Sequence, residues 1–287
     1  MKSNNLNNPL VRQEPETKPR NWIPMVLIGL SIAYISLIIY IPAINVFYQA
    51  FHQGIDPFLA NLTKPDFLTA VKVTVSLALI AVPINTVFGL CAAWSIARHK
   101  FPGRTLLLSI IDLPLSISPV VAGLMIMLLY GRQGWFGAWF QDRGIDIVFA
   151  FPGMVLATAF VSMPFVVREV IPVLEESGVD QEEAAKTLGA SDWQIFWRVT
   201  LPNIRWGLMY GVLLTNARAM GEFGAVSVVS GNVANTTQSL PLFVEEAYKQ
   251  YDTEAAFSAA VLLALLAAVT LVIKEILESK TRIKDEK

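Results

Sequence analysis

Two charged residues, Arg218 and Glu222, lie in the otherwise uncharged stretch from Trp206 to Ser230. A charge near the centre of a bilayer costs about 2.5–3.5 kcal/mol on insertion scales, so these side chains must face protein or water. Their i, i+4 spacing lets them neutralise each other on one helix face, which predicts an internal ion pair that orients the helix. Alternatively, Arg218 donates hydrogen bonds to a bound anion, which its planar guanidinium suits.

A second group of polar residues interrupts the apolar stretch 106–130. Asp112 is followed by two prolines, Pro114 and Pro119, and by two serines, Ser116 and Ser118. Prolines break helical hydrogen bonding, and nearby hydroxyls can satisfy the freed backbone groups. A kinked, hydroxyl-bearing segment of this kind is suited to line a cavity. Asp112 would repel an anion, so we predict a structural or cytoplasm-facing role for it.

The sequence has no recognisable catalytic or nucleotide-binding pattern. The GxxxxGK[ST] phosphate loop is absent, so a nucleotide would have to bind a separate subunit. The histidines, His52 and His99, do not form an HExxH motif, no nucleophile elbow occurs, and Cys91 is a single cysteine. A net charge of −1 offers no basic field to nucleic acid. We therefore predict that the chain is not an enzyme and binds no metal, cofactor or nucleic acid.

The elements that hold these residues follow from the distribution of charge. Of 287 residues, 54% are apolar and only 16% are charged, whereas a soluble domain averages about 25% charged residues. About 20 apolar residues span the hydrocarbon core of a bilayer. The sequence therefore predicts an all-α integral membrane protein with six transmembrane helices, at residues 23–51, 71–97, 106–130, 147–171, 206–230 and 255–277.

Lysine and arginine set the predicted orientation. Of 22 such residues, 16 fall in the two termini and the two loops on their side, five fall in the opposite loops, and Arg218 lies within a span. This bias places both termini in the cytoplasm. Residues 1–22 are expected to form a disordered cytoplasmic tail, and residues 278–287 a second cytoplasmic tail. The first apolar run is too long for a signal peptide and is expected to remain as a helix.

The cytoplasmic segment 173–205 is too long for a simple connection between helices, which usually takes about 2–8 residues. It is predicted to contain two short helices. Asp180 begins the first, with Glu183 at the capping-box spacing, and Gly189 ends it in the left-handed conformation. Ser191 caps the second, with Gln194 at its third position.

The second short helix has an aromatic face. Trp193, Phe196 and Trp197 recur at i, i+3 and i+4, and Pro202 is predicted to end the helix. A helix–glycine–helix elbow with an apolar face, held beside a membrane domain, is suited to dock into another protein. The alternative is a loop that packs only on its own bundle.

The same segment resembles the EAA motif of the permeases of binding-protein-dependent ABC importers. The matching residues have the spacing that is usual in this family: Glu183-Ala184-Ala185, Gly189, Val199 and Leu201-Pro202. Val199 stands where the family usually has isoleucine. The resemblance implies a type I permease fold whose core is residues 67–274. It also implies that the elbow, with Trp193, is the coupling helix that sits in a groove of an ATP-hydrolysing subunit. ATP is then used by that partner, and the permease itself binds no cofactor.

Within this family, the segment Arg218 to Val226 resembles the fifth-span motif of sulfate and molybdate permeases. Three later segments are most similar to the W-type subunit of sulfate/thiosulfate importers: Val229 to Asn232, Leu240 to Leu242, and Ala256-Phe257. The resemblance implies a bacterial-type inner-membrane subunit that forms half of an oxyanion pathway, in which Arg218 is a candidate donor of hydrogen bonds to a divalent oxyanion. The implied partners are a second, T-type permease, two copies of an ABC ATPase and an external sulfate-binding receptor.

Two alternatives remain. One is a permease for another oxyanion, molybdate or tungstate. The other is a secondary transporter that works alone, which usually shows paired halves with broken helices or intramembrane acids that relay protons. Six unequal spans and a docking elbow argue against the second alternative.

Overall fold

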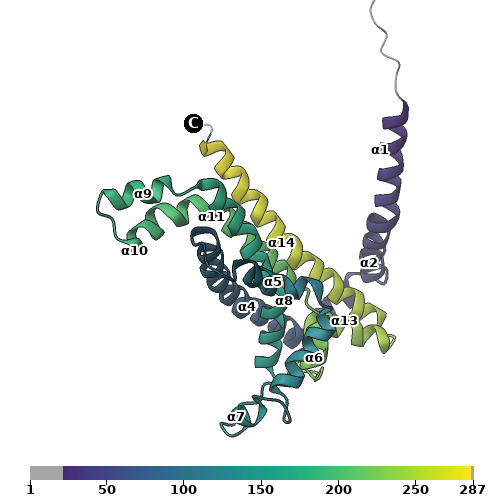
Figure 1. The fold of residues 1–287 in the computed structure, drawn as a ribbon. Coiled ribbons are helices and arrows are strands. Elements are labelled where there is room, and N and C mark those ends of the chain that lie inside the picture. Colours follow the sequence, from purple (N-terminus) through teal and green to yellow (C-terminus); the bar gives the residue numbers. More distant parts are fainter. Residues whose placement is uncertain (1–21, 286–287) are drawn as a thin grey trace, which may run out of the picture. The chain divides into compact units, whose positions relative to one another are not determined.

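The computed structural model describes residues 22–285, and these contain helices and no strand (Figure 1). The chain divides between Asn45 and Val46 into two units. The predicted disordered tail, residues 1–22, lies outside the described residues except for Trp22.

The first unit is a helical rod without a core of its own. It consists of α1 (Trp22–Ile35), a π-helical turn η1 (Ser36–Tyr40) and the beginning of α2 (Ile41–Phe51). The apolar helix Pro24–Phe51 has 28 residues, and none of its most hydrophobic stretch is buried. Its apolar side chains therefore require lipid or another protein around them. The helix Pro24–Phe51 corresponds to the predicted span 23–51.

The second unit contains the end of α2 and the remaining helices. In chain order these are α3 (Ile55–Leu62), α4 (Pro65–Arg98), α5 (Arg104–Ser116), α6 (Pro119–Tyr130), α7 (Gly137–Gln141), α8 (Phe151–Ser177), α9 (Asp180–Thr187), α10 (Asp192–Ile195), the π-helical turn η2 (Phe196–Thr200), α11 (Leu201–Met220), α12 (Gly224–Val229), α13 (Leu240–Lys249) and α14 (Thr253–Asp285). Figure 1 shows α9 and α10 at one end of this unit, here called the elbow end, and α7 at the other.

Four helices of the described chain are long and apolar enough to cross a membrane: Pro24–Phe51, α4, α8 and the part of α14 from Thr253 to Ile273. A fifth crossing is obtained if α5 and α6 form one span, although the two helices bend by 111° at their junction. The predicted span 106–130 is therefore a broken helix. Pro119 begins α6, a position where its missing N–H leaves no intrahelical bond unmade.

The predicted span 206–230 is wrong as a continuous helix. α11 ends at Met220, three residues follow without helical structure, and α12 begins at Gly224. α11 is not among the four apolar spans. Glu222 explains the new start, because its Oε1 accepts the backbone N–H of Ala225 at 2.7 Å and satisfies a donor in the first turn of α12.

Two further boundaries differ from the predictions. α8 begins at Phe151 rather than at residue 147 and continues to Ser177, beyond the predicted end at 171. α14 continues to Asp285, so the predicted tail 278–287 is helical as far as the structure describes it. Hydropathy predicts only the apolar part of a helix. The helical hydrogen bonds of the backbone continue into polar turns beyond the apolar part, so the helices end later than hydropathy predicts.

α8 is the central helix of the second unit and packs along both α4 and α11. Glycines permit the close approach: a Cβ on Gly89 would lie 2.7 Å from Val166 Cβ, and one on Gly211 would lie 2.9 Å from Val166 Cα. A Cβ on Gly207 would lie 2.7 Å from the side chain of Val173. The pair Gly207 and Gly211 therefore serves packing within this chain, as small residues do in membrane bundles.

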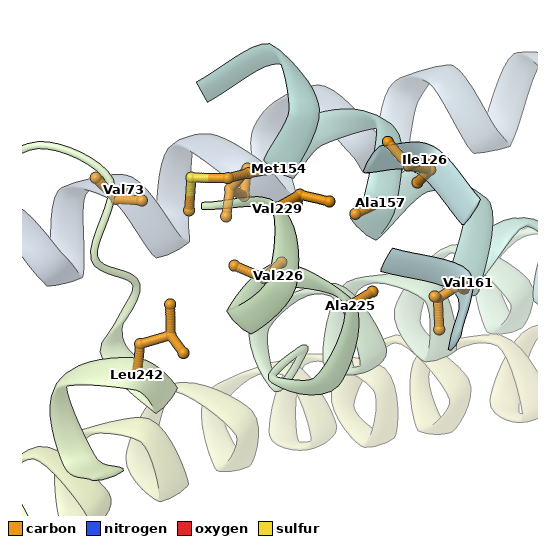
Figure 2. Packing of buried hydrophobic residues seen from close by; sticks show 11 residues of the cluster. Val73, Ile126, Met154, Ala157, Val161, Ala225, Val226, Val229 and Leu242 are labelled. Atoms are coloured by element: carbon orange, nitrogen blue, oxygen red, sulfur yellow. The ribbon is translucent and has the colours of Figure 1, made fainter. Parts of the chain in front are cut away.

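Two hydrophobic clusters hold the bundle at its two ends. Figure 2 shows the cluster away from the elbow, in which side chains of α12 and α6 meet those of α4 and α8; it includes Val73, Leu77, Ile126, Met154, Val226 and Val229. The cluster nearer the elbow joins α4, α5, α8 and α11 through Ala93, Ile96, Ile111, Val170, Leu174 and Ile204. The elbow is thus attached to a packed helical platform.

Candidate functional site

The elbow consists of residues 178–200 and connects α8 to α11. It is shorter than the predicted segment 173–205, because α8 continues to Ser177 and α11 begins at Leu201. The predicted capping box of Asp180 and Glu183 is wrong: Val179 occupies the N-cap position, and no side chain caps α9. Both carboxylates instead lie in the first turn of α9, where negative charge interacts favourably with the helix dipole.

The turn and the second cap are as predicted. Gly189 follows α9 with φ 86°, a conformation that a residue with a Cβ adopts only at a cost. Ser191 Oγ accepts the backbone N–H of Gln194, and Gln194 Oε1 accepts that of Ser191 at 3.0 Å, which completes a capping box.

Pro202 does not end the second helix. α10 passes without a break into η2 and then into α11, and Pro202 lies in the first turn of α11. In a regular α-helix, the ring of a proline clashes with the carbonyl four residues earlier. The π turn directly before it inserts an extra residue and changes the register of the backbone. The second arm of the elbow and α11 are therefore one continuous helical rod.

The elbow exposes several large apolar side chains. The rings of Trp193, Phe196 and Trp197 contact one another, with centroids 5.5–6.1 Å apart. Trp193 is 69% exposed, Trp197 is 51% exposed, and Leu188 at the turn is 88% exposed. The sequence patterns predicted the aromatic face but not the exposure of Leu188. The only sequence feature that could have indicated it is its position directly before Gly189, the glycine of the turn. Exposed apolar groups gathered in this way mark a surface for binding another protein.

The two adjacent glutamates of α9 have different environments. Glu183, the residue of the predicted EAA match, is exposed, as is Ala184. Glu182 is instead paired with Arg98 at the end of α4, with 2.9 Å between Oε1 and Nη2. The sequence patterns did not identify Glu182 or Arg98 as members of an ion pair. Of the other residues of the match, Ala185 and Leu201 are half-buried and Pro202 is exposed.

Arg218 and Glu222 form the ion pair that their spacing predicts. Arg218 Nη1 lies 2.6 Å from Glu222 Oε2, and the Glu222 side chain is only 2% exposed, whereas that of Arg218 is 30% exposed. Because Glu222 Oε1 also accepts the N–H of Ala225, the carboxylate joins α11 to α12 across the break. Part of the Arg218 side chain is accessible from outside the chain.

The two broken helices meet. A Cβ on Gly224 would lie 2.9 Å from Pro119 Cβ, so the start of α12 touches the start of α6. Ser116 and Ser118, at the break between α5 and α6, are exposed, and within the described chain neither hydroxyl forms a hydrogen bond. For the described residues, the expectation that these hydroxyls satisfy freed backbone groups is therefore wrong.

Asp112 has a partner that the sequence did not reveal. Its Oδ1 lies 2.8 Å from Arg168 Nε on α8. Arg168 lies within α8, nine residues before the helix ends at Ser177. The pair agrees with a structural role for Asp112. Among the residues that the structure describes, no group of three or more His, Cys, Asp or Glu side chains could hold a metal ion.

Comparison with known families identifies the fold. Residues 85–283, more than half of the chain, match the model of the family described as binding-protein-dependent transport system inner membrane component. The chain belongs to this family. Membership confirms the resemblance to ABC importer permeases, and with it the expectation of an all-α, multi-pass membrane protein.

Individual permeases are similar over most of the chain. The sulfate transport system permease protein CysW of Synechocystis sp. is 66% identical over 259 residues, which are 90% of this chain and 94% of that protein. CysT of Escherichia coli strain K12, also named a sulfate transport system permease protein, is 40% identical over 241 residues, 83% of this chain and 87% of its own. A crystal structure of a bacterial ABC transporter involved in alginate import has a TM-score of 0.75 and 19% identity, covering 92% of this chain and 96% of that chain, which shows a shared fold.

Proposed function

We propose that this permease is the W-type subunit of an ATP-driven sulfate/thiosulfate importer and forms half of its translocation pathway. The observation that carries the proposal is the 66% identity to a sulfate permease over 90% of the chain. The lower identity to a second sulfate permease, CysT, supports a complex with two different permease subunits. Two ATPase subunits and an external receptor complete the proposed assembly in a bacterial-type inner membrane.

The elbow is the proposed docking site for the ATPase. Leu188, Trp193 and Trp197 expose apolar surface, and Glu183 is exposed on the same short segment. Tryptophan is among the residues most enriched in interface hot spots. The elbow then faces the cytoplasm, as the distribution of lysine and arginine predicts, with both termini on the same side. ATP binds only the partner, and this chain is a non-catalytic subunit without a cofactor.

The meeting point of the broken helices is the proposed pathway for the anion. Arg218 is paired but still partly exposed, and the hydroxyls of Ser116 and Ser118 are exposed without an acceptor in this chain. Guanidinium and hydroxyl groups both donate hydrogen bonds to an oxyanion. The buried Glu222 competes with the anion for Arg218 and so limits the affinity of Arg218 for the anion. A low affinity favours passage of the anion over its retention.

ATPase activity of the reconstituted complex tests the substrate. The receptor is loaded in turn with sulfate, thiosulfate, molybdate or phosphate, and ATP hydrolysis in proteoliposomes is measured together with uptake. We expect stimulation by sulfate and thiosulfate. Stimulation by molybdate alone would support the alternative oxyanion, and uptake by this chain without the ATPase would support a secondary transporter.

Variants of the elbow test the docking site. Gly189→Val places a β-branched residue at φ 86°. Asparagine adopts the left-handed conformation more readily than valine, so Gly189→Asn is the matched control. We expect Gly189→Val and Glu183→Arg to leave the protein in the membrane but to abolish receptor-stimulated ATP hydrolysis, and Gly189→Asn to retain it. Normal sulfate uptake by both Gly189→Val and Glu183→Arg would contradict the proposed docking site.

A further inference from the structure

Arg98 and Glu182 form a largely buried ion pair at the elbow end of the bundle. The Arg98 side chain is 8% exposed and that of Glu182 is 19% exposed. Arg98 is the last residue of α4, and Glu182 lies in the first turn of the elbow helix α9. Breaking a buried pair leaves an uncompensated charge, so such a pair holds its two elements together firmly.

Arg98 uses its guanidinium to bind three groups at once. Nε and Nη2 donate to the Glu182 carboxylate at 3.1 and 2.9 Å. Nη1 donates to the carbonyl of Leu174 near the end of α8 at 2.7 Å, and Nη2 also lies 3.4 Å from Ser177 Oγ. The planar fork of arginine is required for this geometry, because the single ammonium of lysine cannot reach all three acceptors.

Glu182 extends the network to the other arm of the elbow. Its Oε1 accepts the hydroxyl of Thr200 at 2.9 Å, and Thr200 is buried at the end of η2. One carboxylate therefore joins the end of α4, the first arm of the elbow and the π turn that leads into α11.

The chain connections of the elbow explain why this network matters. The elbow continues directly into α11, and it joins α8 through Gly178, which has φ 62°. It has no chain connection to α4. Within residues 22–285, Arg98 is the one residue of α4 that forms a hydrogen bond or ion pair with residues 178–200.

We propose that the Arg98–Glu182–Thr200 network transmits displacement of the elbow to α4, with Arg98 as the positioning residue. The inference rests on the proposed function, because it assumes that a partner ATPase moves the elbow. It also assigns different tasks to two adjacent glutamates: Glu183 faces the partner, and Glu182 fixes the elbow to the membrane helices. Without Arg98, the elbow moves with α11 while α4 stays in place.

The test uses the complete complex with its ATPase and receptor in proteoliposomes, with radiolabelled sulfate as the probe. The variants are Arg98→Gln, Arg98→Lys and Thr200→Val. Arg104→Gln is the matched control, because Arg104 also joins helices at the elbow end, through Glu175 of α8 at 2.7 Å, but within residues 22–285 it forms no hydrogen bond or ion pair with residues 178–200. The amount of co-purified ATPase, basal ATP hydrolysis, receptor-stimulated hydrolysis and uptake are measured for each variant.

We expect Arg98→Gln to bind the wild-type amount of ATPase and keep basal hydrolysis, but to lose at least tenfold in sulfate imported per ATP hydrolysed. Arg98→Lys should recover part of this ratio, and Arg104→Gln should keep it. Thr200→Val removes one hydrogen bond with little change in shape and should lower the ratio severalfold, so it tests the network even if Arg98→Gln does not fold. Spin labels on α4 and α9 should report a nucleotide-dependent distance change only in the variant without Arg98.

Several outcomes would overturn the inference. These are an unchanged ratio in Arg98→Gln or Thr200→Val, loss of bound ATPase from Arg98→Gln, and an equal loss of coupling in Arg104→Gln. Failure of the proposed function is distinct, because the wild-type complex would then import no sulfate and would not respond to the receptor.

Discussion

Replacing Gly211 by alanine should force α8 and α11 apart. The new Cβ would lie 2.9 Å from Val166 Cα, whereas ordinary contact begins at 3.4 Å. The obstacle is backbone, which no rotamer change removes, so the helices must separate by about half an ångström. Overpacking of this kind costs about 1–3 kcal/mol, and the better helix propensity of alanine offsets about 0.5–1 kcal/mol of it. We expect a net loss of about 1–2 kcal/mol.

Thermal unfolding of the purified chain in detergent measures this loss. For 150–250 residues, 1 kcal/mol corresponds to about 2–4 °C, so Tm should fall by about 2–8 °C. Gly29→Ala is the matched control, because it makes the same chemical change within α1, where nothing lies within 4 Å of the new Cβ. It should leave Tm unchanged or raise it slightly. A Tm of Gly211→Ala equal to that of Gly29→Ala would refute the close packing of α8 and α11.

Three further predictions concern charges and caps. Arg218→Ala leaves Glu222 buried without its partner and should destabilise the chain by about 3–5 kcal/mol, measured by Tm and membrane yield, whereas Arg218→Lys should retain both. Ser191→Ala removes the capping box and should speed amide hydrogen exchange in α10, since such caps are worth about 0.5–2 kcal/mol. The pKa of Lys249 is raised by its hydrogen bond to Glu245, so Lys249 should react with amine reagents more slowly at pH 9 than in Glu245→Gln.

Each of these predictions has an internal control. Ser239 occupies the N-cap position of α13 without a capping hydrogen bond, so Ser239→Ala should leave exchange in α13 unchanged. A raised lysine pKa means that the pair with Glu245 is complete below the ordinary lysine pKa and is lost only as pH rises through the higher value. Reactivity of Lys249 should therefore become the same in both proteins only at a pH above both lysine pKa values, where the amine is deprotonated in each. Full transport by Arg218→Ala would exclude both the ion-pair and the pathway role of Arg218.

Patterns of local sequence predicted the elements that depend on local chemistry. Gly189 and the box of Ser191 and Gln194 are correct, because a left-handed turn and a cap each involve a few neighbouring residues. The i, i+4 pair of Arg218 and Glu222 is correct for the same reason. The cap at Asp180 failed because the helix begins one residue earlier than its composition suggests.

Contacts between distant residues were beyond these patterns. Arg98 and Glu182 are 84 positions apart, and Asp112 and Arg168 are 56 apart, so no periodicity links them. Hydropathy also failed to separate α11 from α12, because the break lies among residues that are apolar except for Glu222. Pro202 lies within a continuous helix because a π turn precedes it, and a π turn has no reliable signature in a single sequence.

The weak hydrophobicity of α11 has a consequence for the biogenesis of the protein. Unlike α4 and α8, α11 is not one of the helices that are apolar enough to cross a membrane by themselves, and it ends with Arg218 close to its last turn. Release of such a segment into lipid alone is unfavourable by a few kcal/mol for the arginine. Its packing partners, α4 and α8, are synthesised before it, and α8 presents the surface that accepts Gly207 and Gly211. The order of the helices along the chain is therefore also an order of insertion, in which the centre of the bundle enters the membrane first and then admits the helix that carries the charge.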